Sequence, residues 1–261
     1  MELFAQRVLV VGCVHSDTGW LVNTVLPAAR DLSCEAVLVA GDFGYWGSSP
    51  KLVQKAGASL KRFGVATWFI DGNHEDHPRL RKTIAALGDG SKITNITGSL
   101  YHIGRGGVVT VGGLKVVGMG GAASIDKGYR SQGVDWFEEE LIDDHDVNEA
   151  IAAGRGDVLV SHDAPSGWEI PGIAPRETLD EKWLQELPDC EAHQRILRVV
   201  YESVVPKILI HSHYHSGYEI ISEEAWGDVR VVGLDQDHTT KWGRVLYEKN
   251  GEPALSDWVT R

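Results

Sequence analysis

The sequence is poor in the features that mark secreted, membrane-spanning and disulfide-stabilised proteins. Its 261 residues include three cysteines, Cys13, Cys34 and Cys190, without the CxxC spacing of a zinc ribbon. Three cysteines, an odd number at scattered positions, suit a protein of a reducing compartment. No apolar run approaches the roughly 18 residues of a membrane span. The N-terminal segment lacks the basic start and long apolar stretch of a signal peptide. We therefore expect a cytoplasmic protein without a membrane partner.

Positive charge is also scarce. The chain has 25 basic and 37 acidic side chains, which gives a formal net charge of −12. Such a balance opposes bulk attraction to a polyanion, so we expect no long nucleic acid as partner. A small anion can still bind where metal ions supply local positive charge. With 43% hydrophobic residues and no repeat, low-complexity tract or linker, the chain predicts one domain over residues 1–261.

The first third of the chain alternates short apolar runs with helix-length segments. The pattern predicts strands over residues 7–11, 36–40 and 65–70, and helices over about 18–32 and 50–63. Strands that alternate with helices indicate βαβ crossovers and a largely parallel sheet.

The rest of the chain is richer in β-type residues. Two runs around Gly112-Gly113 predict a hairpin, and the acidic segment 135–149 predicts a solvated helix. A further helix is expected over about 191–204. The remaining expected strands are 157–161, 207–210, 217–222, 228–233 and 244–248.

Polar residues follow five of the predicted strands. The segments are Gly12-Cys13-Val14-His15, Gly41-Asp42, Gly72-Asn73-His74-Glu75, Ser161-His162-Asp163 and His211-Ser212-His213. Ligands of parallel sheets bind beyond the carboxyl ends of the strands, where several loops converge. Imidazole, carboxylate and amide oxygen together suit Mn, Fe or Zn. The candidate ligands are too many for one tetrahedral site, and their number predicts two adjacent metal ions, divalent or trivalent.

Local spacing supports this convergence. Side chains two residues apart on an extended segment point the same way, so Cys13 with His15, and His211 with His213, can each present two ligands to one point. The glycine before Asp42 and the one before Asn73 let the backbone turn sharply there. His215 continues the alternation, and we expect it on the solvent side or behind the ligands.

The ordered set of motifs resembles that of the calcineurin-like metallophosphoesterases. Their motifs run Asp-x-His, Gly-Asp-x-x-Asp, Gly-Asn-His-Asp/Glu, a lone His and Gly-His-x-His, and the match extends from Gly12 to His213. The resemblance is to the compact microbial or phage phosphodiesterase type. It implies an α/β fold, a four-layer α-β-β-α sandwich of two mixed sheets, in one such domain.

The resemblance also implies a role for each matching residue. His15 would bind the first metal ion with Asp42 and His213, and Asp42 would bridge both ions. Asn73, His162 and His211 would bind the second ion. A hydroxide that bridges the metals would attack phosphorus, and His74 would assist the leaving group.

The chain departs from the family pattern at three positions. Cys13 replaces the first aspartate, Tyr45 the second acid of Gly-Asp-x-x-Asp, and Ile210 the glycine before His211. Cys13 matters most, because a thiolate binds Zn or Fe readily but Mn less so. Cys13 either ligates the first metal ion as thiolate or stays out of the centre as a small buried thiol.

By resemblance to compact microbial members of the family, the expected substrate is a small phosphodiester, either a cyclic nucleotide, including the 2′,3′ kind, or an aryl phosphodiester. The alternatives are a phosphomonoesterase or nucleotide pyrophosphatase with the same metals, and a non-catalytic binding scaffold. A non-catalytic scaffold would be expected to have lost Asp42, Asn73 and His74, and all three are present. Trp20, Trp46 and Trp168 follow strand ends and either stack a nucleobase or anchor their loops. Arg105 and Arg176 either bind a second phosphate or pair with acids.

Overall fold

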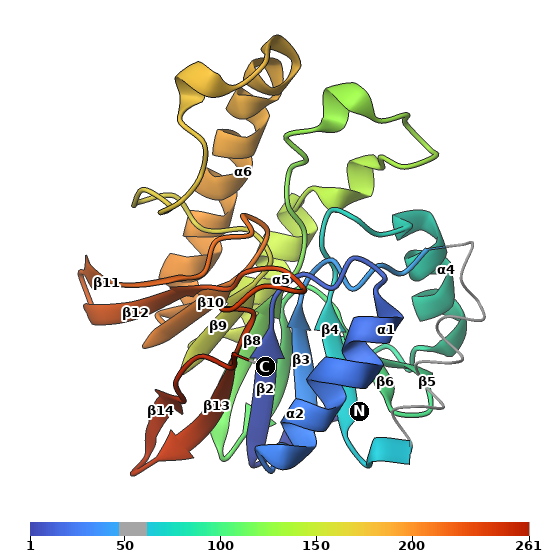
Figure 1. Ribbon diagram of the computed structural model, residues 1–261, viewed down its shortest axis with the longest axis vertical. Coiled ribbons are helices and arrows are strands. Elements are labelled where there is room, and N and C mark those ends of the chain that lie inside the picture. The colour runs from blue at the N-terminus through green and yellow to red at the C-terminus, as the bar shows by residue number, and fades with distance from the viewer. Residues whose placement is uncertain (47–61, 261) are drawn as a thin grey trace.

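Two seven-stranded mixed sheets pack face to face in the computed structural model, which describes residues 1–46 and 62–260 (Figure 1). The first sheet has the order β14-β13-β2-β3-β4-β6-β5. Its strands, in that order, are Glu252–Leu255, Gly243–Lys249, Arg7–Val11, Ala36–Ala40, Ala66–Ile70, Leu100–Ile103 and Ile93–Thr97. Strands β2, β3, β4 and β6 run parallel, and the two edges are antiparallel.

The second sheet has the order β1-β7-β8-β9-β10-β12-β11. Its strands are Phe4–Ala5, Gly107–Val111, Leu114–Met119, Val158–Ser161, Ile208–His211, Gly227–Gly233 and Tyr218–Glu224. Strands β8, β9, β10 and β12 are parallel. The hairpin expected around Gly112-Gly113 is formed by β7 and β8.

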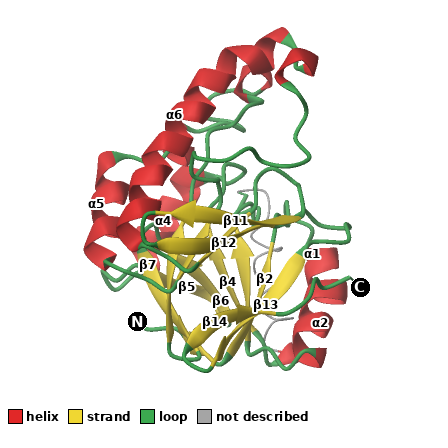
Figure 2. Ribbon diagram, turned by 90° about the vertical axis from the view of Figure 1, so that its left-hand side faces the viewer, coloured by secondary structure: helices red, strands yellow, loops and turns green. Residues whose placement is uncertain are grey.

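Helices cover the outer face of each sheet (Figure 2). The α-helices are α1 Thr18–Trp20, α2 Leu26–Asp31, α4 His77–Leu87, α5 Asp144–Ala153 and α6 Glu181–Val204. A π-helical turn, Leu21–Val25, joins α1 to α2, and short 3₁₀ turns lie at Lys127–Tyr129, Glu138–Glu140 and Arg176–Thr178. In both ribbon views the N-terminal part of α6 extends beyond the edges of the sheets.

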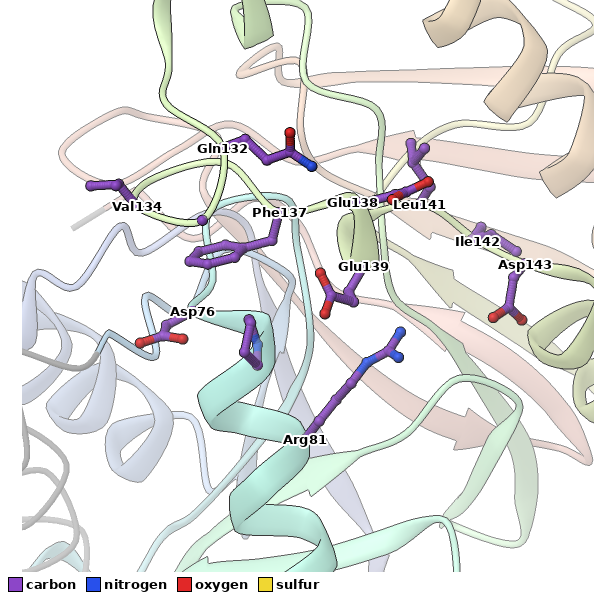
Figure 3. Close-up of a pocket in the computed structure, with 12 residues that line it drawn as sticks. Asp76, Arg81, Gln132, Val134, Phe137, Glu138, Glu139, Leu141, Ile142 and Asp143 are labelled. Atoms are coloured by element: carbon purple, nitrogen blue, oxygen red, sulfur yellow. The ribbon is translucent and has the colours of Figure 1, made fainter.

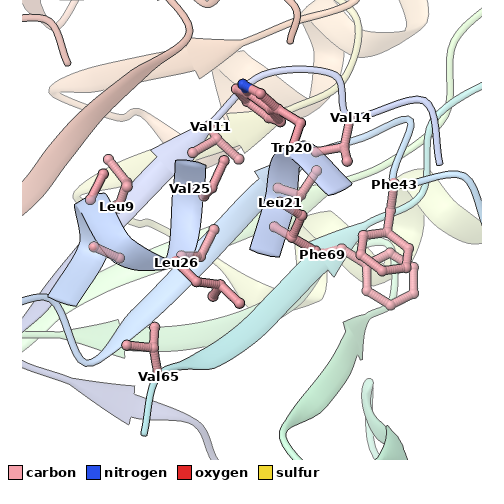
Figure 4. Close-up of a cluster of buried hydrophobic side chains, with 14 of the residues drawn as sticks. Leu9, Val11, Val14, Trp20, Leu21, Val25, Leu26, Phe43, Val65 and Phe69 are labelled. Atoms are coloured by element: carbon pink, nitrogen blue, oxygen red, sulfur yellow. The ribbon is translucent and has the colours of Figure 1, made fainter. Parts of the chain in front are cut away.

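Alternation along the strands divides the apolar side chains into three cores. Leu9 and Val11 of β2 pack against Trp20 and Leu21 in the core under α1, α2 and α4 (Figure 4). Val8 and Val10 point to the opposite face of the same strand, into the core between the sheets. The third core lies between the second sheet and helices α5 and α6. Three cores between four layers confirm the α-β-β-α sandwich.

The boundaries follow the sequence closely in the first third of the chain. Strands β2 and β3 have the expected bounds, and β4 begins one residue later than expected, at Ala66. The helix expected over 50–63 lies mostly outside the described residues. The α6 helix begins at Glu181 instead of 191, because Asp180 caps it. The acidic segment is α-helical only from Asp144 onward, and its earlier part contains only the short 3₁₀ turn at Glu138–Glu140.

Several elements were not predicted from the sequence: β1, β5, β6, β14 and α4. Strands β1 and β14 are short edge strands with only one partner each, so they carry little apolar alternation. No helix in the described part of the chain combines the length and apolarity that a bilayer crossing requires.

Candidate metal centre

Polar side chains from both sheets meet at the carboxyl ends of the central parallel strands. Cys13 and His15 follow β2, Asp42 follows β3, and Asn73 follows β4 of the first sheet. From the second sheet come the residues after β9 and those at and after the end of β10, which are His162, His211, His213 and His215. The centre therefore lies where the two sheets adjoin.

The backbone is strained at this edge. His15, Asp42, His213 and His215 have φ of 48°, 49°, 66° and 50°, a region that costs a non-glycine residue on the order of 1 kcal/mol or more. Strain at four residues of one cluster indicates that their side chains are held in place for a function.

Two glycines permit the close approach. A Cβ atom at Gly41 would lie 2.0 Å from Nδ1 of His162, and one at Gly72 would lie 2.1 Å from Oδ1 of Asp42. Both positions therefore disfavour any larger residue. Gly41 also has a φ of 92°, as the sharp turn predicted before Asp42 requires, whereas Gly72 has no positive φ and is needed for the close approach alone.

A first group of donors surrounds one oxygen of Asp42. Donor atoms of Cys13, His15, Asp42 and His215 all lie within 4.8 Å of one another. His15 Nε2 is 3.5 Å from Asp42 Oδ2, and the His15 and His215 ring centroids are 4.9 Å apart. The Cys13 thiol is fully buried, with its sulfur 2.9 Å from the Ser212 hydroxyl oxygen. A thiol, two imidazoles and a carboxylate form a donor set that suits zinc or iron.

A second group surrounds the other oxygen of Asp42. His162 Nε2 lies 3.3 Å from Asp42 Oδ1 and 3.0 Å from Asn73 Oδ1. The Asn73 amide nitrogen donates to the Ser124 hydroxyl at 2.9 Å, so its oxygen faces His162. Asp42 thus stands between the two groups with one carboxylate oxygen toward each, which is the arrangement that a bridging ligand needs.

Two of the sequence-predicted ligands lie apart from these contacts. His211 is fully buried, and its Nε2 is 2.6 Å from the Tyr218 hydroxyl. The His213 ring packs against His162 at 5.0 Å between centroids. His215, expected on the solvent side or behind the ligands, is exposed, and its donor atom also lies within 4.8 Å of those of Cys13, His15 and Asp42.

His74 lies beside both groups and contacts a charged partner from a distant segment. Its backbone N–H donates to Asp42 Oδ1 at 2.8 Å, and its ring centroid is 5.7 Å from that of His15. Arg130 places Nη2 3.0 Å from His74 Nδ1 and 2.8 Å from Asp126 Oδ2. Arg130 could not be identified from the sequence, because it lies 56 positions from His74 and belongs to none of the five motifs.

Charges in the centre are coupled through Asp42. Burial alone would raise the pKa of the Asp42 carboxyl, but the His162 and His15 imidazoles hold that pKa well below its usual range. Burial opposes protonation of His162, yet the Asp42 carboxylate raises the pKa of that imidazole to about 9. Burial and the same carboxylate raise the pKa of the Cys13 thiol well above its usual value. A bound cation would reverse this last shift, because metal ligation favours the thiolate.

Neighbouring acids hold the loops and the ligands. Glu75 is buried, and its carboxylate accepts the backbone N–H groups of Gly44 and Tyr45, so it fixes the loop after β3. Asp76 caps α4 through the Arg79 N–H. Asp237 Oδ1 lies 3.8 Å from His15 Nδ1, on the ring edge that does not face Asp42.

A cavity of about 600 Å³ opens beside the centre. The residues Asp42, Asn73, His74, His213 and His215 line one end of it. A second cavity of about 890 Å³ lies between α4 and the segment 132–143 (Figure 3). Its charged lining consists of Asp76, Arg81, Glu138, Glu139 and Asp143, an excess of acid that disfavours a phosphate. The smaller cavity is therefore the candidate substrate pocket.

The candidate stacking and phosphate-binding residues have other contacts. The Trp20 ring packs on Trp242 with centroids 5.2 Å apart, and the Trp168 indole N–H donates to Tyr218. Arg105 is buried and bonded to Asp71 and Asp146, so it is a structural cation.

Comparisons with known proteins address the family and the fold. A family model described as calcineurin-like phosphoesterase matches residues 6–225. The crystal structure of TT1561 of Thermus thermophilus superposes with a TM-score of 0.55 at 12% sequence identity, over 97% of this chain and 98% of that one. A structure titled as a novel phosphatase of Mycoplasma pneumoniae gives a TM-score of 0.43 at 12% identity, over 89% of this chain and 72% of that one. No curated protein matches. At such identity TT1561 supports the fold alone.

Proposed function

The chain belongs to the calcineurin-like phosphoesterase family, whose members are metal-dependent phosphoester hydrolases, and on that basis we propose that it cleaves small phosphodiesters. Cyclic nucleotides, including the 2′,3′ kind, fall in this class. The position of Asp42 carries the proposal, because its two carboxylate oxygens face two donor groups at the end of one cavity. Three free cysteines accord with the cytoplasmic location that we include in the proposal.

The family implies a dinuclear metal centre, and the donor set fits one. Cys13, His15 and Asp42, with His213 or His215, would hold the first ion. Asp42, Asn73 and His162, with His211, would hold the second. The buried Asp42 carboxylate already requires positive partners, which His162 and His15 supply. Manganese, iron and zinc suit imidazole and carboxylate ligands, and the Cys13 thiol favours zinc or iron at the first position. When bound, two such ions lower the pKa of a water molecule and offset the negative charge of the phosphate.

The protein's own groups would position the ester and manage the proton of the leaving group. His74 lines the cavity next to Asp42, where its ring, when protonated, can donate a proton to the departing oxygen. Burial and the Arg130 guanidinium lower the pKa of this ring, and the Asp42 carboxylate opposes that shift. Arg130 contacts the His74 ring and is held in turn by Asp126, so we assign it as a positioning residue for His74. A phosphodiester is an anion and the chain carries a net negative charge, so a bound substrate needs cations close to its phosphate group.

The size of the cavity favours a small substrate. A volume of about 600 Å³ lies within the usual range for small-molecule pockets of roughly 300 to 1,000 Å³. A nucleotide pyrophosphatase would need a cation for its second phosphate. Arg176 lines the cavity, but Glu191 lies 3.6 Å from it. We therefore place the diesterase ahead of the pyrophosphatase.

The test combines metal analysis with a substrate panel. Protein purified without chelator is expected to carry about two ions per chain and to hydrolyse bis(4-nitrophenyl) phosphate with a kcat/KM at least tenfold above that for 4-nitrophenyl phosphate. Asp42→Asn should lose both ions and the activity, because it removes the shared charge. Faster hydrolysis of the monoester would indicate a phosphomonoesterase. Bound metal with no hydrolysis of any ester would indicate the binding scaffold.

A further inference from the structure

The candidate substrate pocket has two chemically different ends. Asp42, Asn73 and His74 line the inner end, while the outer wall is formed by the segment before α6 and by the first turns of α6. Both ribbon views place this part of α6 beyond the sheets (Figures 1 and 2). The outer wall is thus built on elements separate from the strands that position the candidate metal ligands.

The outer wall is largely apolar. The apolar side chains that line the pocket are Ile125, Ile173, Ala174, Leu179, Trp183 and Leu187. Trp183 and Leu187 are half-buried, and Ile173 is 49% exposed. The Asp180 carboxylate caps α6 by accepting the backbone N–H of Trp183 at 3.0 Å, so the first turn of the helix that carries the indole is held in place. Apolar surface that is left open inside a pocket gains free energy when a ligand covers it.

Polar groups of the outer wall already have partners. Arg176 lies 3.6 Å from Glu191, and the Gln194 amide donates to the Tyr214 hydroxyl at 2.6 Å. Among the described residues of this wall, the charged and polar groups therefore pair mainly with one another. Arg176 and Glu191 stay 63% and 50% exposed, but their opposite charges face each other, so the surface without a polar partner is the indole and the aliphatic side chains around it.

We propose that the substrate is a phosphoester with one bulky, uncharged apolar ester group, an aryl ring or a branched alkyl chain, which the outer wall of the pocket binds. Trp183 is the main specificity-determining residue, and Leu187 supports it. This inference rests on the proposed function, because the inner end must hold the phosphate. Residues on α6 would then determine which ester group binds, and residues at the strand ends would carry out the hydrolysis.

The first experiment varies one ester group at constant chemistry. Methyl, phenyl and 2-carboxyethyl esters of 4-nitrophenyl phosphate share a leaving group. When kcat/KM of each ester is divided by its rate of hydrolysis by hydroxide without enzyme, the ratio reports how the other group binds. Burial of a phenyl ring should raise this ratio about tenfold over the methyl ester. The carboxyethyl ester should show no gain. Equal values for methyl and phenyl esters would overturn the inference, while hydrolysis of all three would keep the proposed function.

The second experiment locates the preference. Trp183→Ala should lower kcat/KM for the phenyl ester about tenfold and that for the methyl ester less than about twofold, and Trp183→Phe should restore most of the preference. Leu184→Ala is the matched control, since Leu184 is 36% exposed on the same helix turn and does not line the pocket. A uniform loss on both esters with Trp183→Ala, at unchanged melting temperature, would overturn the assignment of Trp183.

A binding measurement separates the two proposals. Phenylphosphonate and methylphosphonate cannot be hydrolysed at the P–C bond, so calorimetric titration into the metal-loaded protein tests the pocket without turnover. The phenyl compound is expected to bind about tenfold tighter. That preference without any ester hydrolysis would support the apolar pocket and contradict the hydrolase. Ester hydrolysis without that binding preference would support the hydrolase and contradict the apolar pocket.

Discussion

Glu140 offers a test of the electrostatics behind the centre. Its side chain is 1% exposed and accepts hydrogen bonds from the Ser124 backbone N–H at 2.7 Å and from the Ser124 hydroxyl at 2.8 Å. Ser124 in turn accepts the amide of Asn73. Burial raises the pKa of the Glu140 carboxyl from 4.5 to about 7, although the bonds from Ser124 oppose the shift.

The direction of the pH dependence follows from this pKa. Between pH 4.5 and about 7 the carboxyl keeps its proton in the folded chain and loses it in the unfolded chain. The free energy of unfolding therefore falls as pH rises through that window and is constant above it. A shift of this size corresponds to about 3 kcal/mol. Glu140→Gln stays neutral at every pH and should remove this part of the slope.

Urea unfolding at pH 5 and pH 8, with chelator present, measures the effect without metal linkage. The Glu140→Gln variant should gain about 3 kcal/mol relative to the unmodified chain between the two pH values. Glu138→Gln is the control, because the Glu138 side chain is exposed, and it should leave the slope unchanged. Parallel slopes for the Glu140→Gln variant and the unmodified chain would refute the reasoning.

Three further substitutions test individual roles. Cys13→Asp should weaken zinc binding relative to manganese, measured by competitive titration; a ratio unchanged from that of the control Cys34→Ala would exclude the Cys13 thiol as a ligand. His74→Ala should lower kcat by roughly 10² to 10⁴ on diesters with poor leaving groups while metal content stays constant. Parallel loss of metal and activity would contradict its assignment as an acid. Arg130→Gln should lower kcat at nearly constant KM, with partial recovery in Arg130→Lys, which can still pair with Asp126; a rise in KM alone would instead place Arg130 against the substrate.

The parts of the fold that were predicted correctly are those with local, periodic signals. Strands β2 and β3 are uninterrupted apolar runs that end at glycine, so both their extent and their polar ends could be identified. The start of α6 could not, because Pro188 lies inside the helix, at a position where a proline predicts a helix boundary.

The limits of the site prediction have a similar cause. Two residues at i and i+2 share a side only while the backbone is extended. Strand β10 ends at His211, and both His213 and His215 have positive φ. The alternation argument therefore does not apply beyond His211, and it gave no reason to group His215 with Cys13 and His15, whose donor atoms lie within 4.8 Å of its own. Arg130 reaches His74 from an irregular segment that leaves no periodic pattern.

The placement of the candidate ligands on two separate sheets has a mechanical consequence. Asp42 and Asn73 follow strands of one sheet, His162 and His211 belong to the other, and His162 Nδ1 bonds to the carbonyl oxygen of Ala40 across the junction at 2.8 Å. Ions coordinated from both sides would act as cross-links that prevent the sheets from sliding apart. Amides near the ends of β3 and β9 should accordingly exchange with solvent deuterium faster after chelation, whereas those at the opposite ends of the same strands should not respond.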